Sequence, residues 1–166
     1  GGGCINETQA LKLSNGERVF LKSNPSAPKN FFTAEADGLR LLERPKNGPR
    51  VPHPLGISTE SNPQFLLLEY IESSSPKVGF ASRFGQALAE MHRETQEQYG
   101  LDYDNFIGKT VQKNDLELDG LVFFREHRIR FQQELARKTR GLPTSIDKRL
   151  DLFCGKLETL INLKDE

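Results

Sequence analysis

A lysine and a glutamate in the first part of the sequence have the types and positions that phosphate chemistry requires. Lys22 ends the apolar run Val19-Phe20-Leu21-Lys22, and a lysine at the end of an apolar strand can direct its ammonium group towards nucleotide phosphates. Glu35 falls between Phe31 and Leu39 on the inward side of a predicted helix. A carboxylate there needs a partner, and Lys22 supplies the charge. Taken singly, Lys22 is more typical of an ordinary surface lysine, and Glu35 could also be solvated at the edge of the apolar stripe. Together they predict an ion pair within about 4 Å.

Two further segments could complete a nucleotide site. The glycine-rich run Gly1-Gly2-Gly3-Cys4-Ile5-Asn6 precedes a predicted hairpin, and glycines let backbone N–H groups approach phosphate oxygens. By itself such a run is as typical of a flexible end. The apolar run 65–68 leads into Glu69, Tyr70 and Ile71 and then a serine-rich stretch. The backbone of this segment could pair with an adenine edge, as the hinge of a nucleotide-binding site does. Taken by itself, the pattern indicates only a buried strand.

The elements that would position these residues follow from periodicity and turn signals. Asn15-Gly16 joins two short β-type runs, 8–13 and 17–22, and is a strong hairpin signal. Helical spacing predicts a helix over 31–43, and strands are expected at 55–58 and 65–71. After the linker 72–76, helices are predicted at 80–94, 121–140 and 145–163, with 99–119 as a loop. The fold class is therefore α+β: a small antiparallel sheet lobe with one helix (1–72), then the start of a helical lobe (73–166).

Composition favours a globular protein without a strongly charged partner. Lys and Arg number 23, as do Asp and Glu, so net charge favours neither nucleic acid nor membrane as a partner. The basic residues between 121 and 149 are most often a solvated helix face, although they could line the mouth of an anionic substrate site. Cys4 and Cys154 have no metal-type spacing, which favours a reducing compartment, with the cytoplasm as the default.

The order of strand lysine, helix glutamate and hinge resembles the small lobe of protein-kinase-like phosphotransferases, including aminoglycoside and choline kinases. More specifically, the chain resembles the fructosamine (ketosamine) kinases. The segments that carry this resemblance are 1–6, 32–39, 51–56, 66–70, 85–92, 100–108 and 123–128. The runs Asp-Asn-Phe-Ile-Gly at 104–108 and Phe-Phe-Arg-Glu-His-Arg at 123–128 are the most specific, because generic kinases lack them.

The resemblance implies ATP-dependent phosphorylation of the sugar 3-hydroxyl of a ketosamine, or glycated amine. It implies that Lys22 holds ATP phosphates and that Glu35 fixes Lys22. The backbone of Glu69 and Ile71 would hold adenine, with Leu68 beside the ring. The phosphate-cradling segment would comprise Gly2, Gly3, Cys4, Ile5 and Asn6.

The sequence departs from the family at the catalytic step. The family's His-Gly-Asp loop and its magnesium-binding aspartate have no match here, since none of His53, His92 and His127 precedes Gly-Asp. The first strand of the small lobe is missing as well. We therefore expect this chain to be a piece of a longer protein. We expect the chain to contain no catalytic residue, to rely on Mg²⁺ ligands outside it and to be inactive alone.

Three alternatives stay open at this stage. The acceptor could be an alcohol of the aminoglycoside or choline type, or the chain could be a non-catalytic nucleotide-binding or interaction module. Cys4, in a glycine-rich loop near a lysine, could have a lowered pKa and oxidise reversibly, linking two copies into a homodimer. It is equally consistent with an inert small residue.

Overall fold

The computed structural model describes residues 5–161. Its internal contacts divide the chain into two compact units, with the division between Thr95 and Gln96. Each unit is described separately below. The lobe boundary predicted at 72/73 falls before this division, and it stays a prediction.

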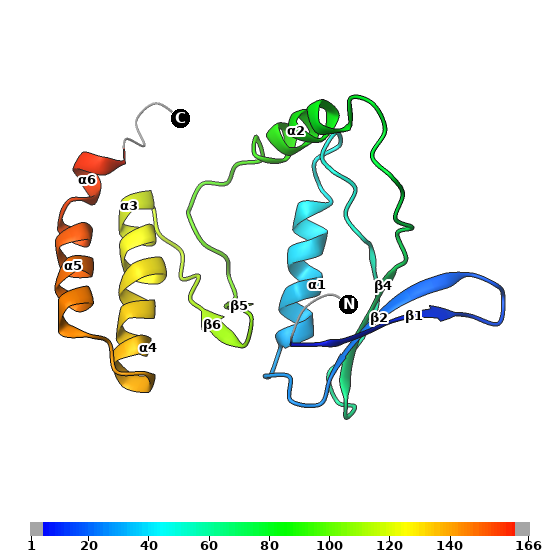
Figure 1. The fold of residues 1–166 in the computed structure, drawn as a ribbon, viewed down its shortest axis with the longest axis horizontal. Coiled ribbons are helices and arrows are strands. Elements are labelled where there is room, and N and C mark those ends of the chain that lie inside the picture. The colour runs from blue at the N-terminus through cyan, green and yellow to red at the C-terminus, as the bar shows by residue number, and fades with distance from the viewer. Residues whose placement is uncertain (1–4, 162–166) are drawn as a thin grey trace. The chain divides into compact units, whose positions relative to one another are not determined.

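A four-stranded antiparallel sheet is the framework of the N-terminal unit, and its strand order is β1-β2-β4-β3 (Figure 1). The predicted hairpin is confirmed, because β1 and β2 are joined by a turn in which Gly16 has a φ of 89°. The strand expected at 65–71 is shorter, since β4 ends at Glu69. The strands are β1 (Glu7–Lys12), β2 (Arg18–Asn24), β3 (Pro54–Ser58) and β4 (Gln64–Glu69).

Helix α1 (Phe31–Leu42) packs against β3 and β4 and closes the core of this unit. Phe32 and Ala36, four residues apart on one helix face, are fully buried, as is Leu66 on the central strand β4. Burial of apolar surface between helix and sheet supplies the main driving force for this arrangement. The core therefore lies directly beside the helix face that carries Glu35.

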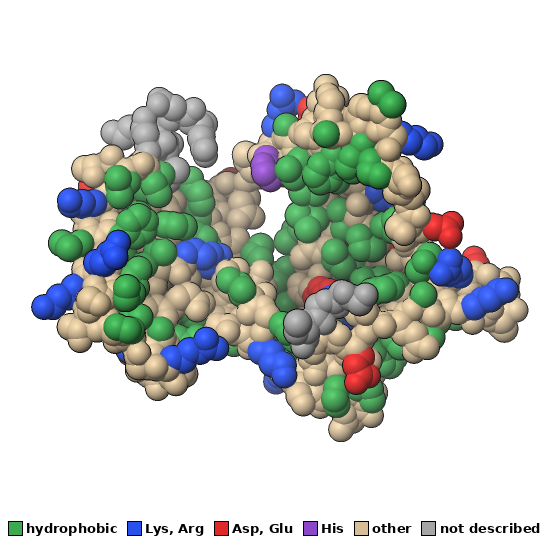
Figure 2. Space-filling model, viewed as in Figure 1, with side chains coloured by type: hydrophobic (Ala, Val, Ile, Leu, Met, Phe, Trp, Pro, Cys, Tyr) green, Lys and Arg blue, Asp and Glu red, His purple; other side chains and the backbone are tan. Residues whose placement is uncertain are grey.

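Helix α2 (Phe80–Met91) forms where it was predicted, but none of its 12 residues is buried. Phe80 and Phe84 stack on each other with ring centroids 5.8 Å apart, and both are about half exposed. Figure 2 shows hydrophobic side chains at the surface around this helix. Helical periodicity thus identified the helix, and its apolar stripe is covered only in part: Leu88 and Met91 are half-buried, whereas Phe84 is exposed.

The C-terminal unit begins with an unpredicted hairpin. Strands β5 (Asn105–Ile107) and β6 (Thr110–Gln112) pair antiparallel inside the stretch expected to be a loop. Their turn uses Gly108 at a φ of 63°, a conformation that favours glycine. Strands of three residues are too short to show a clear alternation of apolar and polar side chains, which explains why the prediction was wrong.

The helical part of this unit is more irregular than its periodicity suggested. The predicted helix 121–140 consists of α3 (Gly120–Phe123), the π-helix η1 (Phe124–Arg130) and α4 (Phe131–Thr139). Its start is capped by Asp119, whose carboxylate accepts from the Leu121 and Val122 amides at 2.8 and 3.1 Å. The last predicted helix is divided into α5 (Thr144–Gly155) and α6 (Leu157–Leu160). Leu157 and Cys154 are buried. No helix among residues 5–161 has the length and apolarity needed to cross a membrane.

Candidate nucleotide site

Lys22 and Glu35 form the predicted ion pair, between the Lys22 ammonium and Glu35 Oε1. Lys22 lies near the end of β2, where it is opposite Leu66 of β4. Glu35 projects from the second turn of α1. Both side chains keep about a quarter of their surface exposed, at 22% and 27%. The pair is thus shielded enough to hold its geometry and open enough to meet a ligand. The contact is confirmed; the phosphate-binding role stays a prediction.

Asn24 holds Ile5 and Asn6, the last two residues of the glycine-rich run, beside the strand that carries Lys22. This residue is 2% exposed. Its side-chain amide donates to Ile5 O at 3.2 Å and to Asn6 Oδ1 at 3.0 Å, while its Oδ1 accepts from Ser26 N at 2.8 Å. Ile5 and Asn6 are therefore held beside β2, whereas Gly2, Gly3 and Cys4 lie outside the described residues. Sequence reasoning missed Asn24, because a polar residue at a strand end looks like the start of a loop.

The predicted hinge residues lie at the end of β4. Leu68 is buried, with 4% of its surface exposed. The Glu69 amide donates to His53 O at 2.8 Å, so this N–H group already has a partner within the unit. Its carboxylate pairs with Arg50, and the hydrogen bond from Arg50 lowers the pKa of Glu69 below its ordinary value. Ile71 lies beyond the end of the strand and is 37% exposed.

Arg18 connects this hinge segment to the start of β2. Its guanidinium lies 3.8 Å from the centroid of the Tyr70 ring, and its Nη1 is 3.3 Å from Glu72 Oε1. A cation over an aromatic face is attracted by the ring quadrupole, here at a partly exposed position where the effect is modest. Local sequence patterns could not predict this contact, because Arg18 and Tyr70 lie 52 positions apart in the sequence.

The two most specific family segments meet around Asn114, which is 1% exposed. The Asn114 amide donates to Tyr103 O and to Asn105 Oδ1, each at 3.0 Å, and its own Oδ1 accepts from Arg128 Nη2 at 2.7 Å. Arg128 also donates to Lys113 O and lies 4.4 Å from the centroid of the Phe123 ring. Burial lowers the pKa of Arg128, and these acceptors replace its lost hydration. The segments thus have a shared structural role in the C-terminal unit.

Comparison with known protein families shows to which family this chain belongs. The family model described as fructosamine kinase matches residues 1–162. The chain belongs to the fructosamine kinase family. It is 38% identical over 138 residues to a probable ketoamine kinase of Enterococcus faecium, covering 83% of this chain and 47% of the relative. It is 36% identical over 151 residues to a chloroplastic protein-ribulosamine 3-kinase of Oryza sativa subsp. indica, covering 89% and 43%. The chain thus spans about half the length of these relatives.

Solved structures of the family share the fold. A structure described as a fructosamine-3-kinase from Haemophilus somnus 129PT superposes with a TM-score of 0.80 at 30% identity, covering 93% of this chain and 52% of that one. A second, from Thermobifida fusca YX-ER1, gives 0.81 at 26% identity, covering 96% and 55%. The predicted α+β, protein-kinase-like fold class is confirmed.

Gly100 offers a direct test of the Asn114 region. Its φ is 115°, and a Cβ there would lie 2.5 Å from Asn114 O, which already accepts from Leu101 N. We expect Gly100→Ala to lower the free energy of unfolding by at least about 2 kcal/mol, because backbone strain and a clash with backbone add together. Urea denaturation followed by circular dichroism measures the change.

Gly141→Ala is the matched control, because Gly141 also has a positive φ, 69°, but a Cβ there would meet nothing within 4 Å. Its cost should be that of the strained backbone alone, about 1 kcal/mol. Equal losses in the two variants would show that the contact with Asn114 is not tight in solution.

Proposed function

We propose that this chain forms the ATP-binding part of an ATP-dependent kinase that phosphorylates the sugar 3-hydroxyl of ketosamines, including fructosamines, as in protein deglycation repair. The observation that carries the proposal is the half-buried Lys22–Glu35 ion pair in a chain of the fructosamine kinase family. Proteins named ketoamine kinase and ribulosamine 3-kinase are among its relatives. The chain covers about half of each, so activity is proposed for the protein that contains it.

In this proposal the described residues bind and orient the nucleotide. The Lys22 ammonium group pairs with the α and β phosphates, and Glu35 holds that ammonium in place from α1. Asn24, two residues after Lys22 on β2, holds Ile5 and Asn6, and backbone amides of the glycine-rich segment approach the phosphates. The Glu69 carbonyl and the Ile71 backbone hold the adenine edge, with Leu68 beside the ring. Phosphoryl transfer then depends on positioning and charge neutralisation.

ATP-dependent kinases use Mg²⁺ together with ATP. Within residues 5–161 no three His, Cys, Asp or Glu side chains come together as a group that could hold a metal ion. In this proposal the Mg²⁺ ligands belong to parts of the protein outside this chain. The ion would neutralise phosphate charge when bound.

Nucleotide binding by the 166-residue chain tests the role of Lys22. We expect Lys22→Ala to weaken binding of a fluorescent ATP analogue about tenfold or more, because a charge-assisted contact to phosphate is lost. Glu35→Gln should weaken binding less, since the ammonium remains but is no longer held. Fluorescence anisotropy titration gives both dissociation constants.

Lys12→Ala is the matched control, because Lys12 is an exposed lysine on the neighbouring strand β1. It should bind the analogue as the unchanged chain does, and circular dichroism should show all variants folded. If Lys22→Ala and Lys12→Ala bind equally well, Lys22 does not hold phosphate and the nucleotide site is misplaced.

The acceptor is tested on the protein expressed from its own complete reading frame. With ATP and Mg²⁺ we expect transfer of one phosphate to a fructosyl-amine, and mass spectrometry with NMR should locate it on the 3-hydroxyl. An aminoglycoside and choline serve as competing acceptors. Transfer to either in preference to the fructosyl-amine would support the related kinase classes, and absence of transfer to all three would favour a non-catalytic nucleotide-binding module.

We also propose a cytoplasmic location and a redox-linked homodimer through Cys4. Support for the dimer is indirect: Cys154, the second of the two cysteines, is buried at 3% exposure, so an intermolecular disulfide would have to use Cys4. Support for the location is the low cysteine content. The rice relative is named as chloroplastic.

Mild oxidation tests the dimer. Diamide accepts two electrons and two protons from a pair of thiols, so treatment should produce a disulfide-linked dimer that migrates at twice the monomer mass on a non-reducing gel. Cys4→Ser should abolish this band, whereas Cys154→Ser should leave it unchanged. A dimer that survives Cys4→Ser, or an unchanged chain that stays monomeric under oxidant, rules the proposal out.

A further inference from the structure

A pocket of about 700 Å³ lies within the C-terminal unit, between α4 and the β5–β6 hairpin. One wall is formed by side chains of α4 and of the residue that follows it, in two rows with a spacing of four residues: Phe131, Leu135 and Thr139, and beside them Gln132, Ala136 and Arg140. The hairpin supplies the opposite wall, with Thr110 and Val111. The volume is within the range of small-molecule sites. The lining combines apolar side chains from both walls with the polar groups of Thr110, Gln132 and Arg140.

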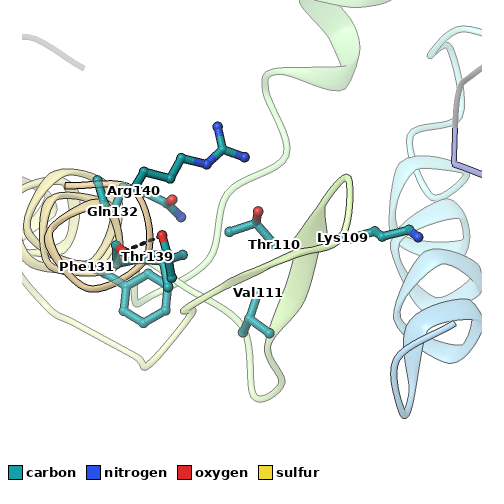
Figure 3. Close-up of a pocket in the computed structure, with 9 residues that line it drawn as sticks. Lys109, Thr110, Val111, Phe131, Gln132, Thr139 and Arg140 are labelled. Atoms are coloured by element: carbon teal, nitrogen blue, oxygen red, sulfur yellow. Dashed lines mark hydrogen bonds between the residues drawn. The ribbon is translucent and has the colours of Figure 1, made fainter. Parts of the chain in front are cut away.

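The charged side chains that line this pocket are both basic. No Asp or Glu is among its described lining residues, while Lys109 and Arg140 are. Figure 3 shows Arg140 extending from the end of α4 across the space in front of Thr110, whereas Lys109 is turned away. Arg140 is therefore the cation available to a molecule in the pocket.

Arg140 directly follows α4 and, among the described residues, has no side-chain partner, unlike the basic side chains of η1 and α4. Arg130 pairs with Asp151, Arg137 with Asp147, and Lys138 with Glu134. Within residues 5–161, no ion pair or side-chain hydrogen bond involves Arg140. An arginine near a helix C-terminus also interacts favourably with the helix dipole. The interaction with the helix dipole needs no pocket. The experiment must therefore separate it from binding of a ligand by Arg140.

The π-helix η1 ends immediately before Phe131, the first residue of the pocket wall. Such segments of wider hydrogen bonding are rare and frequently occur at functional sites. Here η1 turns Arg128 towards Asn114, while the residues that follow line the pocket. The irregular helix thus carries both Arg128, which contacts Asn114, and the residues that line the pocket. A regular α-helix of this sequence would direct these side chains differently.

We propose that this pocket binds a small molecule that carries an anionic group, carboxylate or phosphate monoester, on an apolar or aromatic body. The anion pairs with the Arg140 guanidinium, whose planar fork suits two-point contact with such oxygens. The Thr110 hydroxyl and the Gln132 amide add hydrogen bonds, and the body packs against Phe131 and Leu135. This site is distinct from the residues proposed to bind ATP.

Phenyl phosphate and benzoate are suitable probes, because both combine an aromatic ring with an anion and together they separate the two anion classes. Titration of the isotope-labelled 166-residue chain, followed by amide chemical shifts, should give saturable changes confined to residues 109–112 and 131–140. Phenol lacks the anionic group, and inorganic phosphate lacks the aromatic ring. Each should therefore bind at least tenfold more weakly.

Arg140→Gln should weaken probe binding about tenfold or more, the loss expected for one charge-assisted hydrogen bond. Arg140→Lys keeps the charge at the helix end but not the fork, and should give an intermediate affinity. Ala136→Leu should block the pocket while keeping every charge. Lys138→Gln, on the same helix but outside the pocket, and Lys22→Ala, in the other unit, should change binding less than twofold.

Two results overturn the proposal. Absence of saturable shifts with both probes means that the pocket takes neither class of anion. Probe binding that persists in Arg140→Gln and Ala136→Leu, or that is lost in Lys22→Ala, places the anion elsewhere. Probe binding by Lys22→Ala is measured separately from ATP-analogue binding. A failure of the pocket proposal therefore leaves the proposed ATP site standing, and a failure of the ATP site leaves the pocket proposal standing.

Discussion

The antiparallel pairing of β2 with β4 is the constraint on which the rest of the N-terminal unit depends. Lys22 is opposite Leu66 in this register, and Leu66 is fully buried beside the helix α1 that carries Glu35. Side chains alternate between the faces of a strand, so a slip of one residue would move Lys22 to the wrong face and expose the apolar set. Burial of the core thereby also fixes the geometry of the ion pair.

Two buried asparagines organise the loops that the sheet and helices leave open. Asn24 holds residues 5 and 6 against β2, and Asn114 joins the 103–105 loop to Arg128 of η1. A buried side-chain amide is costly unless its donors and acceptor are satisfied, and in both cases they are. Each asparagine therefore specifies one loop arrangement, because any other would leave polar atoms buried without partners.

The two units use their charges differently. In the N-terminal unit the key cation, Lys22, is held by a carboxylate and kept partly accessible, which suits a group that must be in place before a ligand arrives. In the C-terminal unit, salt bridges from Arg130 and Arg137 tie the helical stretch to α5. The pKa values of Asp147 and Asp151 are lowered chiefly by hydrogen bonds from Arg137 and Gln133, respectively. Arg140, just past the end of α4, stays outside this network.

The sequence by itself determined the features that local patterns encode. Asn15-Gly16 specified the first hairpin, helical spacing specified α1, and the order of Lys22, Glu35 and the strand before Ile71 indicated a kinase-like small lobe. These predictions succeeded because turn chemistry and periodicity act over a few residues. The Lys22–Glu35 pair was also predictable, since a half-buried carboxylate on a helix requires a cation nearby.

Only the tertiary structure decided the contacts between residues far apart in the sequence. The roles of Asn24 and Asn114, the position of Arg18 over Tyr70, the short β5–β6 hairpin and the π-helix all depend on partners brought together by folding. The pocket beside Arg140 is likewise formed by two segments that meet only in the folded unit. Local propensity cannot foresee these features, because the hydrogen bonds and burial that stabilise them do not exist until the chain has closed around them.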